Sequence, residues 1–158
     1  LGPDALDDHV VWRDLLTRLQ DPKFAGRSLA ALYLDQSFVA GIGNYLRSEI
    51  LFNAGLNPFD RPKDLSRRQL GVLARNTLAL TRQAYATSGV TNTAARVKRL
   101  QAMGLSRRRY RHLVFDRQNE DCYHCGGTVE RIEVSGRRIY VCYACQPSAR
   151  AAMTKAEP

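Results

Sequence analysis

The sequence lacks the features that mark several large classes of protein. No apolar run approaches the roughly 18 residues of a membrane span. No basic segment followed by an apolar stretch opens the chain, so secretion is not indicated. It contains no internal repeat, and no cysteine precedes residue 122. The first residue is Leu1, so we expect the chain to be part of something longer.

What the chain contains is typical of a folded protein with a basic surface. Of its 158 residues, 24 are Lys or Arg and 15 are Asp or Glu, which gives a net charge of +9. A hydrophobic content of 44% and a charged content of 25% exclude collagen, a coiled-coil rod and general disorder. The length allows one ordinary domain or two small ones. The positive excess favours a polyanionic partner, most often nucleic acid, although a solubilising surface charge would also explain it.

The positive charge is concentrated in one segment. Residues 1–95 carry a net charge of +2, residues 96–117 a net of +7, and residues 118–158 a net of zero. Such a block repels itself, so it is usually mobile or lies against something negative. Tyr110 and Phe115 are interleaved with the basic residues and could stack on a nucleic acid. A flexible basic linker is the alternative.

Residues 1–95 are expected to be helical. Apolar residues recur at helical spacing over 10–19, until Asp21-Pro22 breaks the pattern. A second short apolar stretch covers 28–34.

The longest helix is predicted after the second proline-containing loop. Ser66 and Gln69 form a capping-box pattern that opens it, and it should end near Gly89. Residues 90–110 have no firm periodicity.

A glycine turn precedes a further predicted helix. Gly41 and Gly43 indicate a tight turn, Asn44 is a favoured N-cap, and Gly55 is a plausible C-cap. A turn at a helix start offers unpaired backbone N–H groups, so it could bind a phosphate. A simple capped turn would explain the same residues.

The four cysteines carry the strongest chemical signal. They form two Cys-x-x-Cys pairs separated by 16 residues, which is the spacing of a structural zinc ribbon: Cys122, Cys125, Cys142 and Cys145. A shell of four cysteines leaves no position for a catalytic water, so we expect one structural zinc ion. Two disulfides, a redox pair, or His124 as a competing ligand are the alternatives.

A β-hairpin is predicted between the two cysteine pairs. Ser135-Gly136 suits a two-residue turn, and alternating apolar residues flank it: Ile132, Val134, Ile139 and Val141. Arg137 and Arg138 follow the turn, where side chains reach away from the ribbon. Arginine there could bind a phosphate, although a solvated turn is the simpler explanation.

Two motifs together resemble a known family. Residues 41–51, Gly-Ile-Gly-Asn-Tyr-Leu-Arg-Ser-Glu-Ile-Leu, preceded by Leu-Asp-Gln-Ser at 34–37, look like the helix–two-turns–helix signature of the bacterial formamidopyrimidine-DNA glycosylase/endonuclease VIII family. The cysteine pattern followed by Gln146 is similar to that family's C-terminal zinc finger. Asn44-Tyr-Leu-Arg47 and Cys125-Gly-Gly resemble the endonuclease VIII branch more closely.

The resemblance implies a chemistry and a set of DNA contacts. Family members excise oxidised bases from a flipped nucleotide and cleave the backbone by β,δ-elimination, with an N-terminal proline as nucleophile. By motif position, Asn44 and Arg137 grip phosphates, and with the neighbouring Gly43 and Arg138 they are the expected DNA-binding residues. No catalytic residue is expected in this chain, because Pro3 neither begins it nor precedes a glutamate.

The fold class expected is mainly α, with a helix–two-turns–helix domain followed by a small zinc-binding β-hairpin. The expected organisation is a DNA-binding domain at 1–95, a basic connecting segment at 96–117, a zinc finger at 118–146 and a flexible tail at 147–158.

The function expected is that of the DNA-binding C-terminal half of a base-excision-repair glycosylase/AP lyase. Its partner should be duplex DNA with a damaged base or an abasic site, and it should be a monomer in the bacterial cytoplasm, associated with the nucleoid and not with a membrane. The alternative is a non-catalytic zinc-ribbon adaptor that binds RNA or a partner protein.

Overall fold

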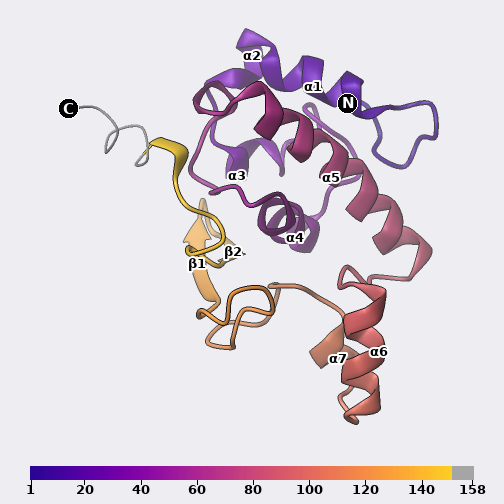
Figure 1. Cartoon of the computed structure of the whole chain (residues 1–158). Helices are drawn as coiled ribbons and strands as arrows, with labels where there is room; N and C mark the ends of the chain where they lie inside the picture. Colours follow the sequence, from indigo (N-terminus) through magenta and orange to yellow (C-terminus); the bar gives the residue numbers. More distant parts are fainter. Residues whose placement is uncertain (151–158) are drawn as a thin grey trace.

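The structure, a computed structural model, describes residues 1–150. Helices dominate it, and one antiparallel hairpin lies near the C-terminus (Figure 1), as the sequence predicts. In chain order the elements are α1 (Trp12–Gln20), α2 (Pro22–Ala25), α3 (Leu29–Leu32), α4 (Asn44–Ala54), the 3-10 turn η1 (Pro62–Asp64), α5 (Arg67–Ala86), α6 (Ala94–Ala102), α7 (Arg107–Tyr110), β1 (Glu130–Val134) and β2 (Arg137–Val141). Within residues 1–150, no helix is long and apolar enough to cross a membrane.

The predicted break at Asp21-Pro22 both ends α1 and begins α2. The Asp21 carboxylate accepts a hydrogen bond from the backbone N–H of Lys23 at 2.9 Å, and Pro22 occupies the first helical position, where its missing N–H costs nothing. The start of α1 lies at Trp12, two residues later than the apolar pattern suggests. There the Asp14 carboxylate accepts from the backbone N–H of Val11 at 2.9 Å.

The capping box that opens α5 is confirmed in both directions. The Ser66 backbone N–H donates to Gln69 Oε1 at 2.8 Å, and the Gln69 backbone N–H donates to Ser66 Oγ at 3.1 Å. The helix ends at Ala86, three residues before Gly89, which has a φ of +105° and cannot continue a helix.

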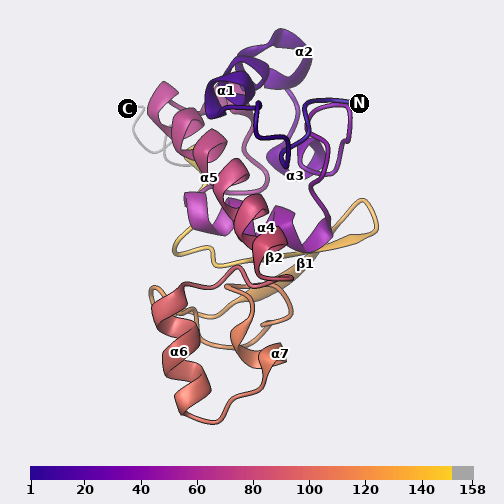
Figure 2. The same cartoon turned by 90° about the vertical axis from the view of Figure 1, so that its right-hand side faces the viewer.

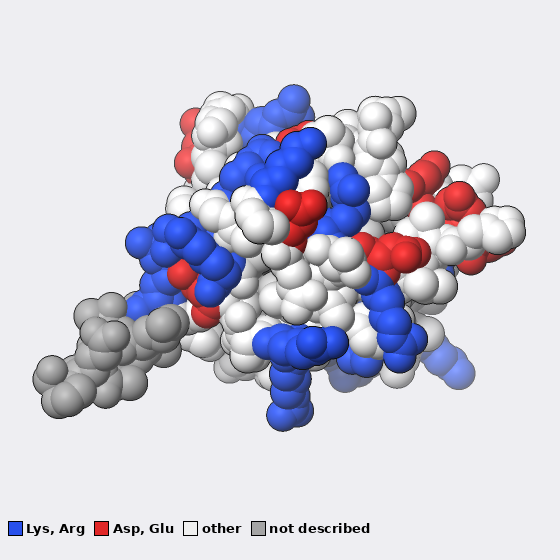
Figure 3. Space-filling model, turned by 90° about the horizontal axis from the view of Figure 1, so that it is seen from above, with Lys and Arg blue, Asp and Glu red and all other residues white. Residues whose placement is uncertain are grey.

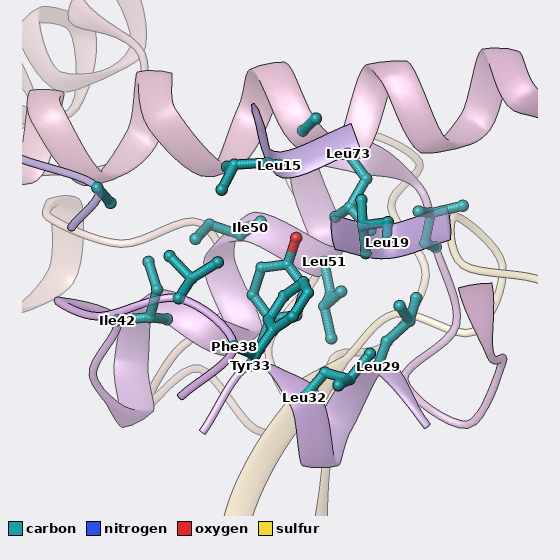
Figure 4. Packing of buried hydrophobic residues seen from close by; sticks show 14 of the residues in the cluster. Leu15, Leu19, Leu29, Leu32, Tyr33, Phe38, Ile42, Ile50, Leu51 and Leu73 are labelled. Carbon is teal, nitrogen blue, oxygen red and sulfur yellow. The ribbon is translucent and has the colours of Figure 1, made fainter. Parts of the chain in front are cut away.

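The main core lies between α5 and the shorter helices beneath it. Figure 4 shows apolar side chains from α1, α4 and α5 gathered around two aromatic rings: Leu15, Leu19, Ile50, Leu51 and Leu73 around Tyr33 and Phe38. The Tyr33 hydroxyl lies 2.7 Å from the hydroxyl of Thr77, so its polar end has a partner in this buried site. This core fixes α4, the helix that begins at the glycine turn.

The hairpin packs directly on the helical part of the molecule. Its two-residue turn has φ values of +52° at Ser135 and +76° at Gly136, as the predicted turn requires. Ile139 of β2 is 1% exposed and belongs to the main core, while Tyr140 belongs to a second core around Cys122 and Cys142. α4 therefore contacts α5 and β2 (Figures 1 and 2).

Residues 94–110, which contain α6 and α7, form an arm beyond the end of α5. Figures 1 and 2 both show this arm at the opposite end of the molecule from α1 and α2. Its helices were not expected, because the sequence over 90–110 has no clear period. α6 begins where the Thr93 hydroxyl accepts from the backbone N–H of Arg96, and a single residue of the helix, Leu100, is buried.

The segment expected as a tail begins with residues that contact the helical part. Ser148 Oγ lies 3.1 Å from one carboxylate oxygen of Asp60, and the backbone N–H of Ala149 donates to the other at 2.7 Å. The rest of the expected tail, 151–158, lies outside the described residues.

Candidate nucleic-acid interface

One side chain braces the turn before α4. Gln36 Oε1 accepts from the backbone N–H of Gly41, and Gln36 Nε2 donates to the carbonyl of Ile42, both at 3.2 Å. Gly41 has a φ of +93° and needs glycine, whereas Gly43, with a φ of −94°, does not. The N-cap of α4 is Gly43, so the expectation that Asn44 caps the helix was wrong: Asn44 is the first helical residue.

The start of α4 is open to a ligand. A Cβ placed on Gly43 would meet no atom within 4 Å, and the first N–H groups of a helix have no partner within it. Asn44 Oδ1 accepts from Arg47 Nη2 at 3.2 Å. This turns Asn44 Nδ2 away from Arg47, and no protein partner for it lies within residues 1–150. Asn44 can therefore donate to an anion beside the helix start.

Arg47 joins the helix start to the hairpin. Its side chain is 1% exposed, and it donates to three oxygen atoms: the Ala30 carbonyl at 2.8 Å, Asn44 Oδ1 at 3.2 Å and the Arg138 carbonyl at 3.3 Å. Because the Arg138 carbonyl belongs to β2, a single guanidinium sets the position of the hairpin relative to Asn44.

The two arginines after the hairpin turn lie on opposite faces of β2. Side chains alternate along a strand, so Arg137 shares a face with Ile139, which packs on the helical core. Arg138 shares the other face with Tyr140. Both arginines are exposed, and Arg137 lies close enough to Arg47 for its charge to act on that buried guanidinium.

The electrostatics agree with this placement. Burial and the neighbouring charge of Arg137 lower the pKa of Arg47 to about 10, so Arg47 stays protonated at neutral pH. No carboxylate lies within 4.0 Å of Arg47 or Arg137 among residues 1–150. Two uncompensated guanidinium groups and the Asn44 amide therefore converge on one region, which favours an anion there.

The four predicted metal ligands lie together. All four sulfur atoms lie within 4.8 Å of one another, with Cys122–Cys145 at 3.8 Å and Cys125–Cys142 at 3.5 Å. A tetrahedral zinc–sulfur site needs sulfur atoms about 3.8 Å apart, whereas a disulfide needs about 2.05 Å. The set therefore fits a metal ion and not two disulfides. The backbone N–H of Gly127 and neighbouring thiols lower the pKa of Cys125 to about 7, whereas burial raises the pKa of Cys142 and Cys145, so without a metal the thiolate forms most readily at Cys125.

His124 takes no part in this cluster. The metal-binding set within residues 1–150 consists of the four cysteines, and His124 is exposed beside them. Its backbone N–H donates to Cys122 Sγ at 3.4 Å, as in a cysteine knuckle.

A buried glutamine connects the cysteine cluster to the helical part. Gln146 Oε1 accepts from the backbone N–H of Cys142, and Gln146 Nε2 donates to the Leu56 carbonyl, both at 2.9 Å. Asn57 Nδ2 donates to the Gln146 carbonyl at 3.0 Å. The cluster is thus fixed on the loop that follows α4.

The sequence did not reveal the roles of the residues that follow Asn44. Ser48 Oγ accepts from the backbone N–H of Tyr140 at 3.0 Å, and the buried Glu49 carboxylate accepts from the backbone N–H groups of 113–115. Burial raises the pKa of Glu49 above its usual value. Three consecutive polar residues inside an apolar helix were the available signal, but partners 64 to 92 residues away cannot be read from spacing.

The basic segment contains both structural and free side chains. Arg117 is buried and donates to the carbonyls of Leu113 and Asp121, each at 2.7 Å, while its guanidinium stacks 3.5 Å from the Tyr123 ring centroid. It therefore supports the zinc-finger fold. Lys98 is exposed and has no partner within residues 1–150.

A hollow of about 600 Å³ lies beside the glycine turn. Aromatic side chains line part of it, with ring centroids 4.9 Å apart for Tyr45–His112 and 5.7 Å for His112–Phe115. Two polar atoms in its lining, Thr81 Oγ1 and Arg111 Nε, are buried without a partner in the described part of the chain. The hollow therefore offers stacking surfaces together with unused hydrogen-bonding groups.

Comparisons with known proteins agree with these features. Residues 1–95 match the family model described as the formamidopyrimidine-DNA glycosylase H2TH domain. The chain is 40% identical over 146 residues to endonuclease 8 of Escherichia coli O6:K15:H31, and the match covers 92% of this chain and 52% of that protein. The chain thus spans about half the length of the curated relatives it matches.

Solved structures show the same fold. The MutM (Fpg) protein of Thermus thermophilus superposes with a TM-score of 0.74 and 31% identity, over 94% of this chain and 54% of that one. A Lactococcus lactis Fpg in complex with DNA containing an abasic site gives a TM-score of 0.72 over 94% of this chain and 52% of its own. At 21% identity, this second likeness supports the fold alone.

Proposed function

Because this chain belongs to the formamidopyrimidine-DNA glycosylase/endonuclease VIII family, we propose that it holds duplex DNA for a base-excision-repair glycosylase/AP lyase acting on oxidised bases. The curated relative quoted above is an endonuclease 8, in line with the wording of the Asn44–Arg47 motif. The protein would work as a monomer in the bacterial cytoplasm at the nucleoid.

The observation that carries the proposal is the double contact of Arg47. By bonding both Asn44 Oδ1 and the Arg138 carbonyl, it keeps the helix start and the hairpin tip in one arrangement. We propose that Asn44 Nδ2 and the Gly43 end of α4 bind one phosphate and that Arg137 binds a neighbouring one. Such contacts position the duplex and carry no base specificity. Arg138, on the other face of β2, would contribute less to this pair of contacts.

The four cysteines would hold one structural zinc ion in this proposal. Bound zinc would supply folding energy to the hairpin segment, whose second core is small. Each thiolate would fill one position of a tetrahedral shell, which leaves the ion no role in the reaction.

The reaction itself would depend on residues outside this chain. In our proposal the chain binds the phosphates and orients the duplex, while the amine that attacks the sugar comes from elsewhere in the full protein. This chain alone should then give no covalent product with abasic DNA. Trapping of an imine on this chain by borohydride would contradict that part of the proposal.

Binding measurements test the DNA contacts. We expect this chain to prefer a duplex with a stable abasic analogue over an undamaged duplex of the same sequence. Asn44→Ala and Arg137→Ala should each weaken binding by about 1–3 kcal/mol, because each removes a hydrogen-bond donor to a phosphate. Fluorescence anisotropy at fixed salt is a suitable measurement.

Arg138→Ala is the matched control, since it removes the same charge one residue away, on the other face of the strand. It should weaken binding less than Arg137→Ala does. Equal losses for the two variants, or binding to single-stranded RNA as tight as to duplex DNA, would favour the adaptor function instead.

A further inference from the structure

The arm at residues 94–110 is the most basic part of the molecule. It contains six Lys or Arg residues and no Asp or Glu. The face formed by α1, α2 and α5, at the other end of the molecule, differs: there Lys and Arg side chains are interspersed with Asp and Glu (Figure 3). The arm therefore carries charge of one sign, whereas that face carries both signs.

Half of these basic residues hold the arm in place. Arg107 Nη2 donates to the Ser88 carbonyl at 2.5 Å, at the end of α5. Arg96 Nη1 donates to Asn92 Oδ1 at 3.0 Å, and its guanidinium lies 5.0 Å from the Tyr123 ring centroid. Arg109 lies 3.5 Å from Glu120. Each of these three side chains therefore has a partner within the protein.

The other three basic side chains of the arm have no such partner. Lys98, Arg99 and Arg108 are exposed, and none has a hydrogen-bond, ion-pair or ring partner within residues 1–150. Two residues on from Arg96, Lys98 lies on the opposite side of α6 from the zinc finger, given 3.6 residues per turn. Three positive charges on one small arm repel one another, and this lowers the stability of the arm slightly unless an anion lies against them.

The arm lies close to the candidate interface. Ser88 and Gly89 line the hollow that also contains Gly41 and Tyr45 of the turn region. Arg107, the first residue of α7, bonds to Ser88 and therefore lies at the rim of this hollow. Arg108 is the next residue of the same helix. Asn44 precedes Tyr45 directly, so a duplex bound at Asn44 would lie near this rim.

We propose that the arm is a second duplex-DNA contact, in which Lys98, Arg99 and Arg108 bind backbone phosphates beyond the pair bound by Asn44 and Arg137. This rests on the proposed function, because it needs DNA on the same side of the molecule. The partner is a polyphosphate and not an acidic protein, since Met103 is the one large hydrophobic residue exposed on the arm among the described residues.

The salt dependence of binding tests the proposal. Each lost phosphate contact makes the slope of log affinity against log salt shallower by about 0.9 for duplex DNA. The triple variant Lys98→Ala/Arg99→Ala/Arg108→Ala should therefore have a slope shallower by about 2.7, with an equal loss on abasic and undamaged duplexes. Retained zinc content and thermal unfolding of the variant would show that it is folded.

The matched control is the triple variant Lys63→Ala/Arg67→Ala/Arg68→Ala. These three residues are also exposed without a partner among residues 1–150, and they lie at η1 and the start of α5. The control removes the same total charge, but at residues away from the arm. Its slope should therefore change by less than about 0.9, the value expected for one phosphate contact. Equal slopes for the two triple variants would overturn the proposed role of the arm.

The result separates this inference from the proposed function. If Arg137→Ala weakens binding while the arm variant matches its control, the proposed phosphate contacts of Asn44 and Arg137 are supported and the proposed DNA contact of the arm is wrong. If the arm variant alone loses salt dependence, DNA binds on the arm without the proposed pair. In either case one hypothesis is supported and the other is contradicted.

Discussion

Arg47 holds a buried positive charge without a carboxylate. Its partners are two carbonyl groups and one amide oxygen, and its Nε has no partner in the described part of the chain. Burying a charge on such terms is costly, and the nearby charge of Arg137 adds to the cost. A phosphate bound beside them would offset this repulsion. In the proposed function, DNA would supply that phosphate.

His112 should make the stability of the protein depend on pH. Burial and the charge of Arg111 lower its pKa to about 4, although Glu49 lies 3.7 Å from its Nδ1. The unfolded chain binds a proton below about pH 6.5, whereas the folded one resists it until about pH 4. His112 therefore stabilises the fold fully above pH 6.5, and this stability is lost as the pH falls toward 4. Between pH 7 and pH 5 the loss should be about 2 kcal/mol.

His112→Phe is the variant that isolates this effect, because a phenyl ring can keep the contacts with Tyr45 and Phe115. Denaturant unfolding at both pH values should show a smaller difference in the variant than in the parent. Comparing the two differences removes the contribution of the cysteines, which also take up protons in acid. Equal pH dependence would mean that His112 is protonated equally easily in both states.

At the scale of elements, Gln146 should be the critical link between the zinc finger and the helices. Gln146→Ala would leave the Cys142 N–H and the Leu56 carbonyl buried without partners. Each such group costs about 1–3 kcal/mol, so the free energy of unfolding should fall by about 2–6 kcal/mol in a denaturation experiment. Gln101→Ala, at an exposed glutamine of α6, should change it by less than about 0.5 kcal/mol. A similar small change for both would show that water satisfies these groups.

The elements differ in how far the sequence predicts them. The Ser66–Gln69 capping box and the Ser135-Gly136 turn depend on neighbours in the chain, so local rules were sufficient for them. The cysteine cluster followed from ligand spacing. The helices of the arm did not follow, because few of their residues are buried and no apolar period marks them. Arg47 could not be assigned either, since its partner in β2 is 91 residues away.

At the scale of the whole molecule, the two halves of the interface depend on one another. The hairpin contributes Ile139 to the helical core, and α4 reaches the hairpin through polar contacts of Arg47 and Ser48. Both polar contacts reach the backbone of β2, so they depend on where that strand lies. The geometry of Arg137 relative to Asn44 should therefore be sensitive to anything that loosens the zinc finger.

If the proposed metal and phosphate contacts are right, removing the metal should abolish phosphate binding by Arg137 and leave most helices folded. Without a metal, four thiols replace the bonds that close the second core, and the hairpin loses the folding energy that a small segment needs. Arg137 would then be held no longer beside Asn44. After chelation and dialysis we expect duplex affinity at or below that of Arg137→Ala, with the helical circular dichroism signal largely kept. Zinc should restore binding in the parent and not in Cys142→Ser, whose ligand set is incomplete. Unchanged duplex affinity in a chain shown by elemental analysis to be metal-free would contradict the dependence of Arg137 on the metal site.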